Sequence, residues 1–359
     1  MLKIGIIGCG KQADAHAGPI QEMAGCKIVG VCDREELMAK QLYERFKVGK
    51  YFSDVYRLLE DTRPDIIHIT TPPQSHLELG ILCLEAGCHV FFEKPFALNS
   101  GEAERLITLA GRKNLKLTVG HNNQFNHAAR RMRELVRDGF LGGPPVHMES
   151  IFCYDLGDPG FAKAFLGDKS HWVRKLPGKL LHNIISHGIS KIAEYLKNDS
   201  PRVITYGFSS PFLESIKQKD IIDELRVIIH DNDYTTAYFT FSSSISPKLH
   251  QFCLYGPVNS LVVDHTHETL IKVSKANYKS YLRNFIPPLI DAKQYLTNAG
   301  KNIEKFIKRD FHMESGRKFL IETFYKSILD DAPLPISYGE IILTSRIMDS
   351  IFAQIYPSH

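Results

Sequence analysis

The first residues whose types and spacing suggest chemistry form a glycine-rich turn near the N-terminus. Gly8, Gly10 and Ala13 match the pattern G-x-G-x-x-G/A and directly follow a short apolar run. In this pattern the first glycine makes a tight turn, the second lets backbone approach a pyrophosphate, and a small third residue lets helix pack on strand. The following helix, which begins at Lys11 and Gln12, would offer its N–H groups to the phosphates. The pattern predicts a dinucleotide site.

An acidic residue follows at the distance that such a site requires. Asp33 stands twenty positions after Ala13, where a carboxylate would hold the ribose hydroxyls of adenosine. A carboxylate there repels the 2′-phosphate of NADP, so we expect NAD as cofactor. The adjacent Arg34 leaves NADP open, because its guanidinium could pair with that phosphate. The alternative is a structural turn followed by a solvated Asp.

A lysine follows a later apolar run. Lys94 comes just after Val90–Phe92, at the strand end where ligands of open α/β sheets bind. An ammonium beside a positively charged nicotinamide would have a lowered pKa, which suits proton transfer. The alternative is a solvated lysine before the turn residue Pro95.

A histidine and an amide occur one helical turn apart in the middle of the chain. His187 follows Asn183 by four residues, so the two would share one face of a helix. An imidazole with a pKa near neutrality can accept a hydroxyl proton as hydride leaves the same carbon. Asn183 cannot take up a proton and could only orient substrate or cofactor. The alternative for His187 is a core or capping histidine.

The elements that position these residues differ between the two parts of the chain. The first third alternates apolar runs with amphipathic stretches, which is typical of parallel βαβ units. The expected strands there cover residues 3–7, 27–32, 66–70, 89–92 and 116–119, and the expected helices 35–46, 75–86 and 101–113. The later strands, at 203–208, 225–230, 235–242, 249–255 and 260–264, partly alternate polar and apolar residues, and the later helices fall at 128–138, 181–196, 316–329 and 338–355.

These patterns predict an α/β protein with two domains, since 359 residues exceed what one hydrophobic core usually supports. Residues 1–121 should form an NAD(P)-binding Rossmann domain with a doubly wound parallel sheet. Residues 122–359 should form an α+β domain with a large, mainly antiparallel sheet, which binds substrate and mediates oligomers.

The ordered set of motifs resembles the Gfo/Idh/MocA family, which includes glucose–fructose oxidoreductase and inositol dehydrogenase. The matches are the glycine turn, Thr71-Pro72-Pro73-Gln74-Ser75-His76, Glu93-Lys94-Pro95 and the helix that bears His187. The resemblance implies that Lys94 lies at the nicotinamide, and that Thr71, Pro72, His76 and Glu93 belong to the cofactor site. It also implies a homo-oligomer, a dimer or tetramer.

The departures from the family pattern bear on the substrate. Asn183 stands where family members commonly carry Asp, which resembles the nucleotide-sugar 3-dehydrogenases of this family. Asn122 and Gln124 could bond to sugar hydroxyls. Trp172 and Lys179, with neighbouring cations, could receive a diphosphate or carboxylate, although a solvated basic loop is an equal alternative.

The leading hypothesis is NAD-dependent oxidation of a secondary alcohol on a sugar, sugar nucleotide or cyclitol. His187 would remove the hydroxyl proton, and Lys94 would polarise the oxygen. One alternative is a redox-neutral glycosidase or epimerase that retains NAD. The other is a non-catalytic dinucleotide sensor, which fold alone does not exclude.

Composition narrows the remaining classes. A net charge of +4 without a dense basic run argues against nucleic acid. The seven cysteines are scattered without a C-x-x-C pair, so we expect reduced thiols and no metal site. The start shows no signal-peptide pattern, so we expect a cytoplasmic protein. The basic segment 272–309 could lie on a membrane surface, but a solvated face or oligomer contact is more common, so membrane association is not expected.

Overall fold

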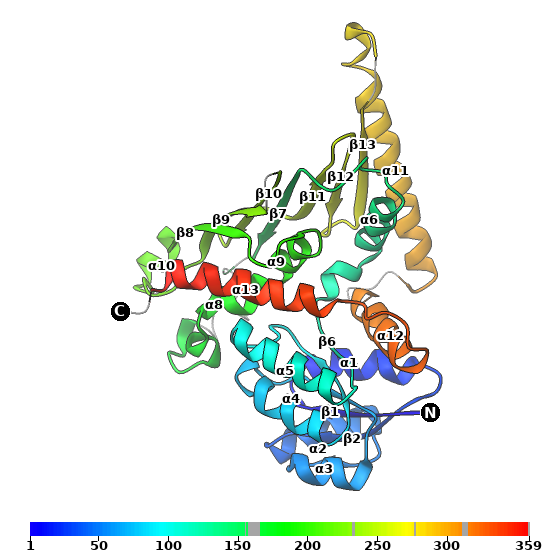
Figure 1. Ribbon diagram of the computed structural model, residues 1–359, viewed down its shortest axis with the longest axis vertical. Helices are drawn as coiled ribbons and strands as arrows, with labels where there is room; N and C mark the ends of the chain where they lie inside the picture. The colour runs from blue at the N-terminus through cyan, green and yellow to red at the C-terminus, as the bar shows by residue number, and fades with distance from the viewer. Residues whose placement is uncertain (155, 157–165, 232–233, 276–277, 311–314, 358–359) are drawn as a thin grey trace. The chain divides into compact units, whose positions relative to one another are not determined.

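The structure is a computed structural model that describes residues 1–154, 156, 166–231, 234–275, 278–310 and 315–357. The chain forms two compact units (Figure 1). Unit 1 comprises Met1–His121 with Arg317–Arg346, and unit 2 comprises Asn122–Gly316 with Ile347–His359.

Unit 1 is built on a six-stranded, fully parallel sheet with the order β3-β2-β1-β4-β5-β6. The strands are β1 (Leu2–Ile7), β2 (Cys26–Cys32), β3 (Tyr51–Phe52), β4 (Ile66–Ile69), β5 (His89–Phe92) and β6 (Leu117–Val119). The order reverses between β1 and β4, and ligands of such sheets bind beyond the carboxyl ends of the strands at this reversal. The predicted doubly wound sheet is therefore confirmed.

Within residues 1–121 of unit 1, four of the five α-helices were predicted, and α3 (Val55–Thr62) was not. The other four are α1 (Lys11–Glu22), α2 (Glu36–Phe46), α4 (His76–Glu85) and α5 (Ser100–Arg112), with the 3-10 turn η1 (Pro73–Ser75) before α4. In α5, Ala103, Leu106 and Ala110 are buried at helical spacing. Asn99 caps this helix by accepting a hydrogen bond from the N–H of Glu102 at 2.9 Å.

Residues 317–346 belong to unit 1, although the predicted division at 121/122 assigned them to the second domain. Most of the helix α12 (Ser315–Leu329) and the first half of α13 (Tyr338–Ile355) lie in this segment. Next to β6, the ammonium of Lys116 donates to the Ser327 carbonyl and to Asp331, and the N–H of Leu117 donates to the Tyr338 hydroxyl at 3.2 Å. These bonds hold the returning segment beside the edge strand β6.

Unit 2 contains a seven-stranded sheet with the order β13-β12-β11-β7-β10-β9-β8. Its strands are β7 (His147–Cys153), β8 (Arg202–Phe208), β9 (Glu224–Asp231), β10 (Thr235–Ser242), β11 (His250–Tyr255), β12 (Asn259–Asp264) and β13 (Thr269–Ser274). All neighbours pair antiparallel except β7 and β10, which are parallel. The predicted mainly antiparallel sheet is confirmed, but its central strand β7 was not predicted.

Helices and 3-10 turns accompany this sheet. They are η2 (Asn122–Phe125), α6 (His127–Arg137), η3 (Trp172–Lys175), α8 (Lys179–Ile184), α9 (Ser186–Ala193), α10 (Pro211–Ser215), η4 (Ser280–Leu282), α11 (Ile286–Ile307) and the end of α13. The single helix predicted at 181–196 is two helices, α8 and α9, joined at Ile185. Helix α9 approaches the sheet closely, because a Cβ on Gly188 would come within 2.2 Å of Phe239.

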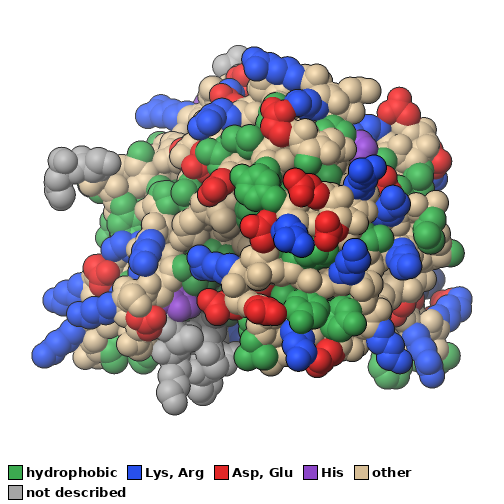
Figure 2. All heavy atoms as spheres, turned by 90° about the horizontal axis from the view of Figure 1, so that it is seen from below, with side chains coloured by type: hydrophobic (Ala, Val, Ile, Leu, Met, Phe, Trp, Pro, Cys, Tyr) green, Lys and Arg blue, Asp and Glu red, His purple; other side chains and the backbone are tan. Residues whose placement is uncertain are grey.

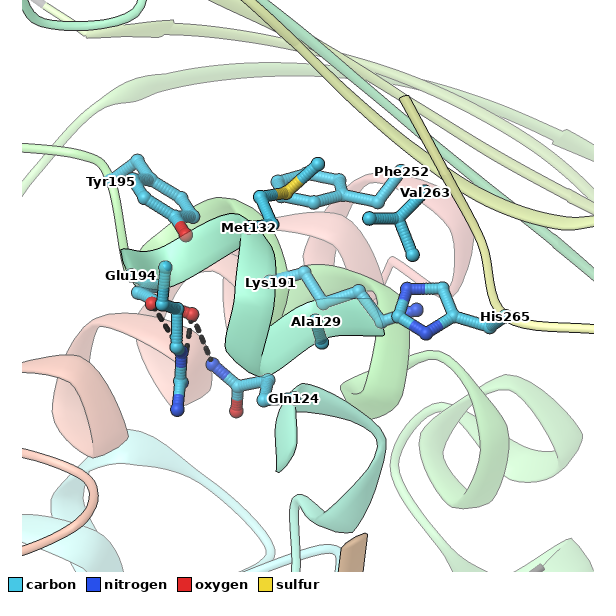
Figure 3. A pocket seen from close by; sticks show the side chains of 10 residues that line it. Gln124, Ala129, Met132, Lys191, Glu194, Tyr195, Phe252, Val263 and His265 are labelled. Carbon is cyan, nitrogen blue, oxygen red and sulfur yellow. Dashed lines mark hydrogen bonds and ion pairs between the residues drawn. The ribbon is translucent and has the colours of Figure 1, made fainter. Parts of the chain in front are cut away.

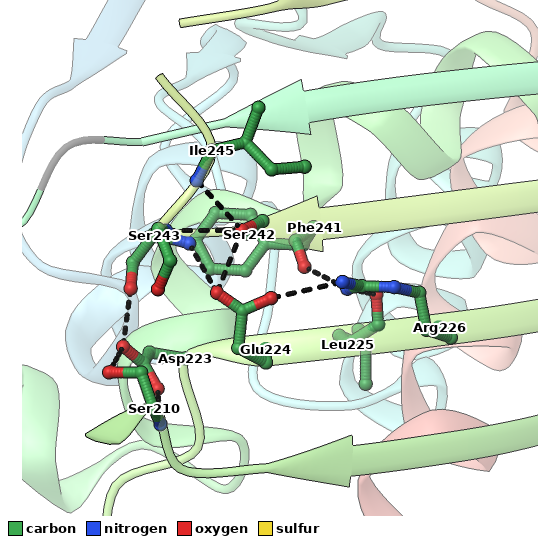
Figure 4. Close-up of polar contacts among 10 residues, drawn as sticks. Ser210, Asp223, Glu224, Leu225, Arg226, Phe241, Ser242, Ser243 and Ile245 are labelled. Atoms are coloured by element: carbon green, nitrogen blue, oxygen red, sulfur yellow. Dashed lines mark hydrogen bonds and ion pairs between the residues drawn. The ribbon is translucent and has the colours of Figure 1, made fainter. Parts of the chain in front are cut away.

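Two buried carboxylates fix the start of β9 (Figure 4). Asp223 accepts from the N–H and the hydroxyl of Ser210 at 2.6 and 2.7 Å, and also from the Ser243 hydroxyl. Glu224 accepts from the Ser242 hydroxyl at 2.7 Å and pairs with Arg226 at 3.1 Å. These bonds satisfy both buried acids, so they serve the architecture of unit 2.

The surface is of mixed charge. Figure 2 shows Lys and Arg side chains interspersed with Asp and Glu over the face drawn there. Six of the seven cysteines are buried, and Cys26 is partly exposed. Among the helices of the described ranges, none combines the length and the hydropathy needed to cross a bilayer.

Candidate functional site

The glycine turn leaves open space where a pyrophosphate would lie. Gly8 has φ +93°, and a Cβ there would come within 2.9 Å of the Thr71 nitrogen, so this position requires glycine. Gly10 precedes α1, and a Cβ there would meet no protein atom within 4 Å. Ala13, in the first turn of α1, is fully buried. The turn therefore fits a dinucleotide whose phosphates approach Gly10 and the N-terminus of α1.

Asp33 is held in place at the end of β2. One carboxylate oxygen accepts from the N–H of Cys9 at 2.7 Å, and the other accepts from the N–H of Glu35 at 3.0 Å. These bonds fix the carboxylate beside the glycine turn, and its remaining lone pairs can accept ribose hydroxyls. Arg34 is exposed.

His76 joins the loops that follow β4 and β5. Its ring nitrogens lie 2.9 Å from the Thr71 carbonyl and 3.0 Å from the Phe96 carbonyl, and the side chain is fully buried. Burial lowers the pKa of His76 despite these backbone contacts. The resemblance places His76 in the cofactor site, whereas in the structure both ring nitrogens contact backbone carbonyls of these two loops. Pro72 is exposed, and the Thr71 hydroxyl accepts from Ser75 at 2.7 Å.

Lys94 stands two residues beyond β5 and is partly exposed. Burial lowers the pKa of its ammonium; Glu93 opposes this effect and the nearby Arg317 adds to it. The amine is therefore easier to deprotonate than an ordinary lysine before any cofactor binds, which suits a group that exchanges protons.

Glu93 turns into the interior of unit 1, where it is 4% exposed. It accepts from His16 at 2.8 Å and from the N–H of Lys94 at 3.0 Å, and lies 3.7 Å from Arg317. Burial alone would raise the pKa of Glu93, but the hydrogen bond from His16 and the charge of Arg317 hold it well below its usual range. Glu93 is thus an ionised anchor for the Lys94 backbone.

A buried chain of polar groups continues from Glu93. His16 Nδ1 lies 2.7 Å from His68 Nδ1, and His68 Nε2 lies 2.8 Å from the Tyr325 hydroxyl. With both imidazoles neutral, hydrogens can run in one direction from Tyr325 through His68 and His16 to Glu93. Burial lowers the pKa of His68 well below its ordinary value.

The sequence patterns did not predict this buried row of polar groups or the contact between Arg317 and Glu93. The guanidinium of Arg317 donates to the Gln12 side chain at 3.1 Å and approaches Glu93, so one cation joins α1 to the residue before Lys94. A signal was present in the sequence, because His68 interrupts an otherwise apolar strand.

The second group of candidates lies in unit 2. Asn183 is the last but one residue of α8 and His187 is the second residue of α9, and both side chains are partly exposed. His187 stacks on Phe152 of β7 with ring centroids 5.9 Å apart. By contrast, the neighbouring His182 is buried and stacks on Phe352, with ring centroids 5.0 Å apart.

Gln124 lies in the interior of unit 2, although we expected it to bind substrate. Its amide donates to Glu194 at 3.1 Å and to the Ser190 carbonyl at 3.3 Å. It lines a cavity of about 10 Å³ with Lys191 and His265 (Figure 3), which is room for one water molecule. Burial lowers the pKa of Lys191 to about 7, although Glu268 acts in the opposite direction.

The predicted basic cluster around Lys179 is partly neutralised. The Lys179 ammonium donates to the Asp220 carbonyl at 2.6 Å and to its carboxylate at 3.3 Å, and Arg174 lies 3.7 Å from the same carboxylate. Trp172 and Asn122 are partly exposed. Asp220 therefore reduces the positive charge that this cluster could offer to a diphosphate.

Comparison with known proteins identifies unit 1. Residues 2–121 match the GFO_IDH_MocA family, described as an oxidoreductase family with an NAD-binding Rossmann fold. Residues 2–121 of unit 1 are therefore similar to the Gfo/Idh/MocA family. The matched residues contain the glycine turn, Asp33 and Lys94, so the predicted family resemblance is confirmed.

Curated relatives match about two fifths of this chain. Myo-inositol 2-dehydrogenase of Thermotoga maritima is 30% identical over 145 residues, which cover 40% of this chain and 43% of that protein. D-glucoside 3-dehydrogenase of Escherichia coli is 31% identical over 142 residues, covering 39% and 40%. The matches thus span about two fifths of the length of these relatives.

Solved structures share the fold over nearly the whole chain. The WlbA dehydrogenase from Bordetella pertussis, solved with NADH and UDP-GlcNAcA, has a TM-score of 0.78 at 15% identity and covers 98% of this chain and 94% of its own. UDP-N-acetylglucosamine 3-dehydrogenase GnnA from Acidithiobacillus ferrooxidans has a TM-score of 0.70 at 19% identity, covering 98% of each chain. At these identities the likeness concerns the fold.

Proposed function

We propose that this Gfo/Idh/MocA protein transfers a hydride between NAD and a secondary alcohol of a sugar, sugar nucleotide or cyclitol. The observation that carries the proposal is the position of Lys94 two residues beyond β5, at the carboxyl edge of the parallel sheet where ligands bind. The substrate class rests on the relatives, whose names include an inositol and a glucoside dehydrogenase.

Each residue has a separate role in the proposed reaction. The alcohol loses a hydride and a proton and becomes a ketone, and bound NAD supplies the hydride acceptor. His187 accepts the hydroxyl proton at a ring nitrogen, and Lys94 donates a hydrogen bond to the substrate oxygen. Asn183 orients the substrate, because an amide donates and accepts hydrogen bonds without taking up a proton.

The buried polar groups around Glu93 fix the backbone at Lys94. Glu93 accepts from the Lys94 backbone N–H and is held ionised by His16 and Arg317. A fixed backbone limits the positions that the Lys94 ammonium can reach, and such preorganisation favours the transition state. Glu93 is therefore a positioning residue in this scheme.

The cofactor preference follows from Asp33. Its carboxylate is fixed by two backbone N–H groups and would repel a 2′-phosphate. We expect NADH to bind at least about tenfold more tightly than NADPH, and Asp33→Ser to reduce this ratio. Fluorescence titrations with each reduced cofactor measure the ratio, and an unchanged ratio in the variant would remove Asp33 from the argument.

An absorbance assay of NADH formation tests the proposed function. Purified protein is offered NAD with free sugars, inositols and UDP-linked sugars, and His187→Ala serves as the inactive control. Turnover with one compound, lost in the variant, supports the dehydrogenase and identifies its substrate class. Nicotinamide released in a 1:1 ratio on denaturation, without turnover, would favour a redox-neutral enzyme. Absence of cofactor binding would reject both.

The outer face of the seven-stranded sheet suggests a homo-oligomer. Ile204, Tyr206, Ile228 and Tyr238 on β8, β9 and β10 are 46–68% exposed, and exposed apolar patches commonly mark contacts between proteins. We propose that a second copy covers them in a dimer or tetramer. Sedimentation velocity should show a smaller species for Tyr206→Glu, and an unchanged sedimentation coefficient would contradict this arrangement.

A further inference from the structure

Helix α11 is attached to the sheet of unit 2 through polar side chains. It runs alongside the edge strand β13, and its first turns extend past that strand (Figure 1). The Gln294 amide accepts from the Lys272 N–H at 2.8 Å and donates to its carbonyl at 3.1 Å. Asn298 bonds to the N–H and carbonyl of Leu270 at 3.3 and 3.0 Å. The helix therefore satisfies the backbone of the edge strand with its polar face.

The opposite face of α11 is apolar and exposed. We call it the apolar stripe, and it consists of Phe285, Leu289, Leu296, Ile303, Phe306 and Ile307, whose exposed fractions are 64, 69, 75, 60, 71 and 73%. The spacings of three, four and seven residues place most of these side chains on one side of the helix. Soluble monomers rarely leave such a continuous apolar surface in water.

The segment that carries the stripe is strongly basic. Residues 272–310 contain nine Lys or Arg and three Asp or Glu, a net charge of +6, whereas the whole chain carries +4. Two of the acids are engaged: Glu304 pairs with Lys308 at 2.6 Å, and Asp310 lies 3.4 Å from His127. In the part of the chain that the structure describes, Lys293 and Lys301 form no ion pair.

A cationic groove lies on the side of α11 that faces α6 and β13, within unit 2. It has a volume of about 440 Å³ and lies between α6, β13 and α11. Among its lining residues Glu268 is the single acid, and the cations are Arg131, Lys272, Lys293, Lys301 and Lys305. Burial lowers the pKa of Lys305, and the charge of Arg130 adds to this effect while Glu268 opposes it. An anion bound in the groove would reduce the electrostatic repulsion among these cations.

We propose that α11 docks the protein on an anionic lipid surface. The apolar stripe enters the boundary between headgroups and acyl chains, and the groove cations contact lipid phosphates. A second copy of the chain fits less well, because each copy would bring the same +6 segment to the contact. A free phosphate would fill the groove but leave the stripe in water. The proposal does not depend on the catalytic activity.

Vesicle co-sedimentation of the full-length protein tests the proposal. Vesicles of phosphatidylcholine alone are compared with vesicles that contain phosphatidylglycerol, at low and high salt. We expect binding to the anionic vesicles that weakens with salt. Lys293→Glu with Lys301→Glu should weaken it about 25-fold or more, since each surface cation contributes about fivefold. Leu296→Glu with Ile303→Glu should weaken it at least about tenfold, because two charges would enter the apolar boundary.

A control variant on another exposed helix guards against nonspecific effects. Leu37→Glu with Lys40→Glu alters an equally exposed apolar side chain and a cation on α2, and should leave vesicle binding unchanged. Failure to pellet with anionic vesicles at low salt would overturn the proposal. The proposal would also fail if the variant with Leu296→Glu and Ile303→Glu still bound anionic vesicles. It would fail too if that variant bound no vesicles but sedimentation velocity showed that it had lost an oligomer of the wild type. Inhibition by inorganic phosphate with no effect of that variant would indicate a soluble anion instead.

Discussion

Removing the charge of Glu93 should destabilise the protein more than removing an exposed carboxylate. Glu93 and Arg317 are 4% and 7% exposed and lie 3.7 Å apart. In Glu93→Gln the amide oxygen can still accept from His16, but the guanidinium of Arg317 loses its buried counter-charge. Breaking a buried pair in this way costs about 3–5 kcal/mol of unfolding free energy, and we expect the lower end because Arg317 retains its bond to Gln12.

The effect of Glu93→Gln should depend on pH. The folded protein holds the pKa of Glu93 well below its ordinary value of 4.5, since His16 and Arg317 outweigh the opposing effect of burial. A carboxyl with a depressed pKa stabilises the folded state above the unfolded pKa, and this contribution is lost as pH falls below it. The difference between wild type and variant should therefore be constant from pH 7 to pH 5 and shrink below about pH 4.5.

Urea unfolding followed by far-ultraviolet circular dichroism measures this difference. The matched control is Glu85→Gln, because Glu85 pairs with Lys113 at the surface, where the two side chains are 51% and 39% exposed. An exposed pair contributes about 0.2–1 kcal/mol. If Glu93→Gln and Glu85→Gln had the same small effect at pH 7, the buried network would not anchor unit 1 as described.

Three further predictions follow from single side chains. Gly10→Ala should weaken NADH binding at least about tenfold without lowering the melting temperature, whereas Gly8→Ala should lower that temperature because its φ of +93° and the Thr71 contact exclude a Cβ. Lys191→Met should raise the unfolding free energy by about 2–4 kcal/mol below pH 7, and the gain should shrink as pH rises from 7 to 10.5, since burial lowers the pKa of Lys191 from 10.5 to about 7. Tyr325→Phe should cost about 1–3 kcal/mol in urea unfolding by leaving His68 Nε2 without its partner. Unaltered NADH affinity of Gly10→Ala would contradict the first prediction. A gain in unfolding free energy of Lys191→Met that did not depend on pH would contradict the second, and unaltered stability of Tyr325→Phe the third.

The sequence predicted most of the parallel sheet, because its strands are short runs buried on both faces. The burial of all four residues of β4 and of nearly all of β5 shows why continuous apolar runs were sufficient there. Strand β7 was missed because it follows Pro144-Pro145 and mixes polar residues into its pattern, and its neighbours come from distant parts of the chain. The break at Ile185 was missed because Leu181–Leu196 keeps an apolar helical pattern across it.

The candidate site residues of unit 1 were easier to predict than the buried residues that hold them in place. Gly8, Gly10 and Asp33 could be found from local spacing, because each acts through its own strand end. The partners of Glu93 could not, since His16, His68 and Arg317 are brought together by the fold across most of the chain. For the same reason the interior position of Gln124 depends on α9, which lies some seventy residues away.

Steady-state kinetics of Lys94→Met with the substrate identified in the panel tests the central claim most directly. Lys94 has a lowered pKa at the carboxyl edge of the sheet, and the proposed reaction requires its ammonium at the substrate oxygen. We predict that kcat falls at least about a hundredfold, while the affinity for NADH stays within about threefold because the phosphates and adenosine bind elsewhere. An unchanged kcat, with NADH still bound, would contradict the account.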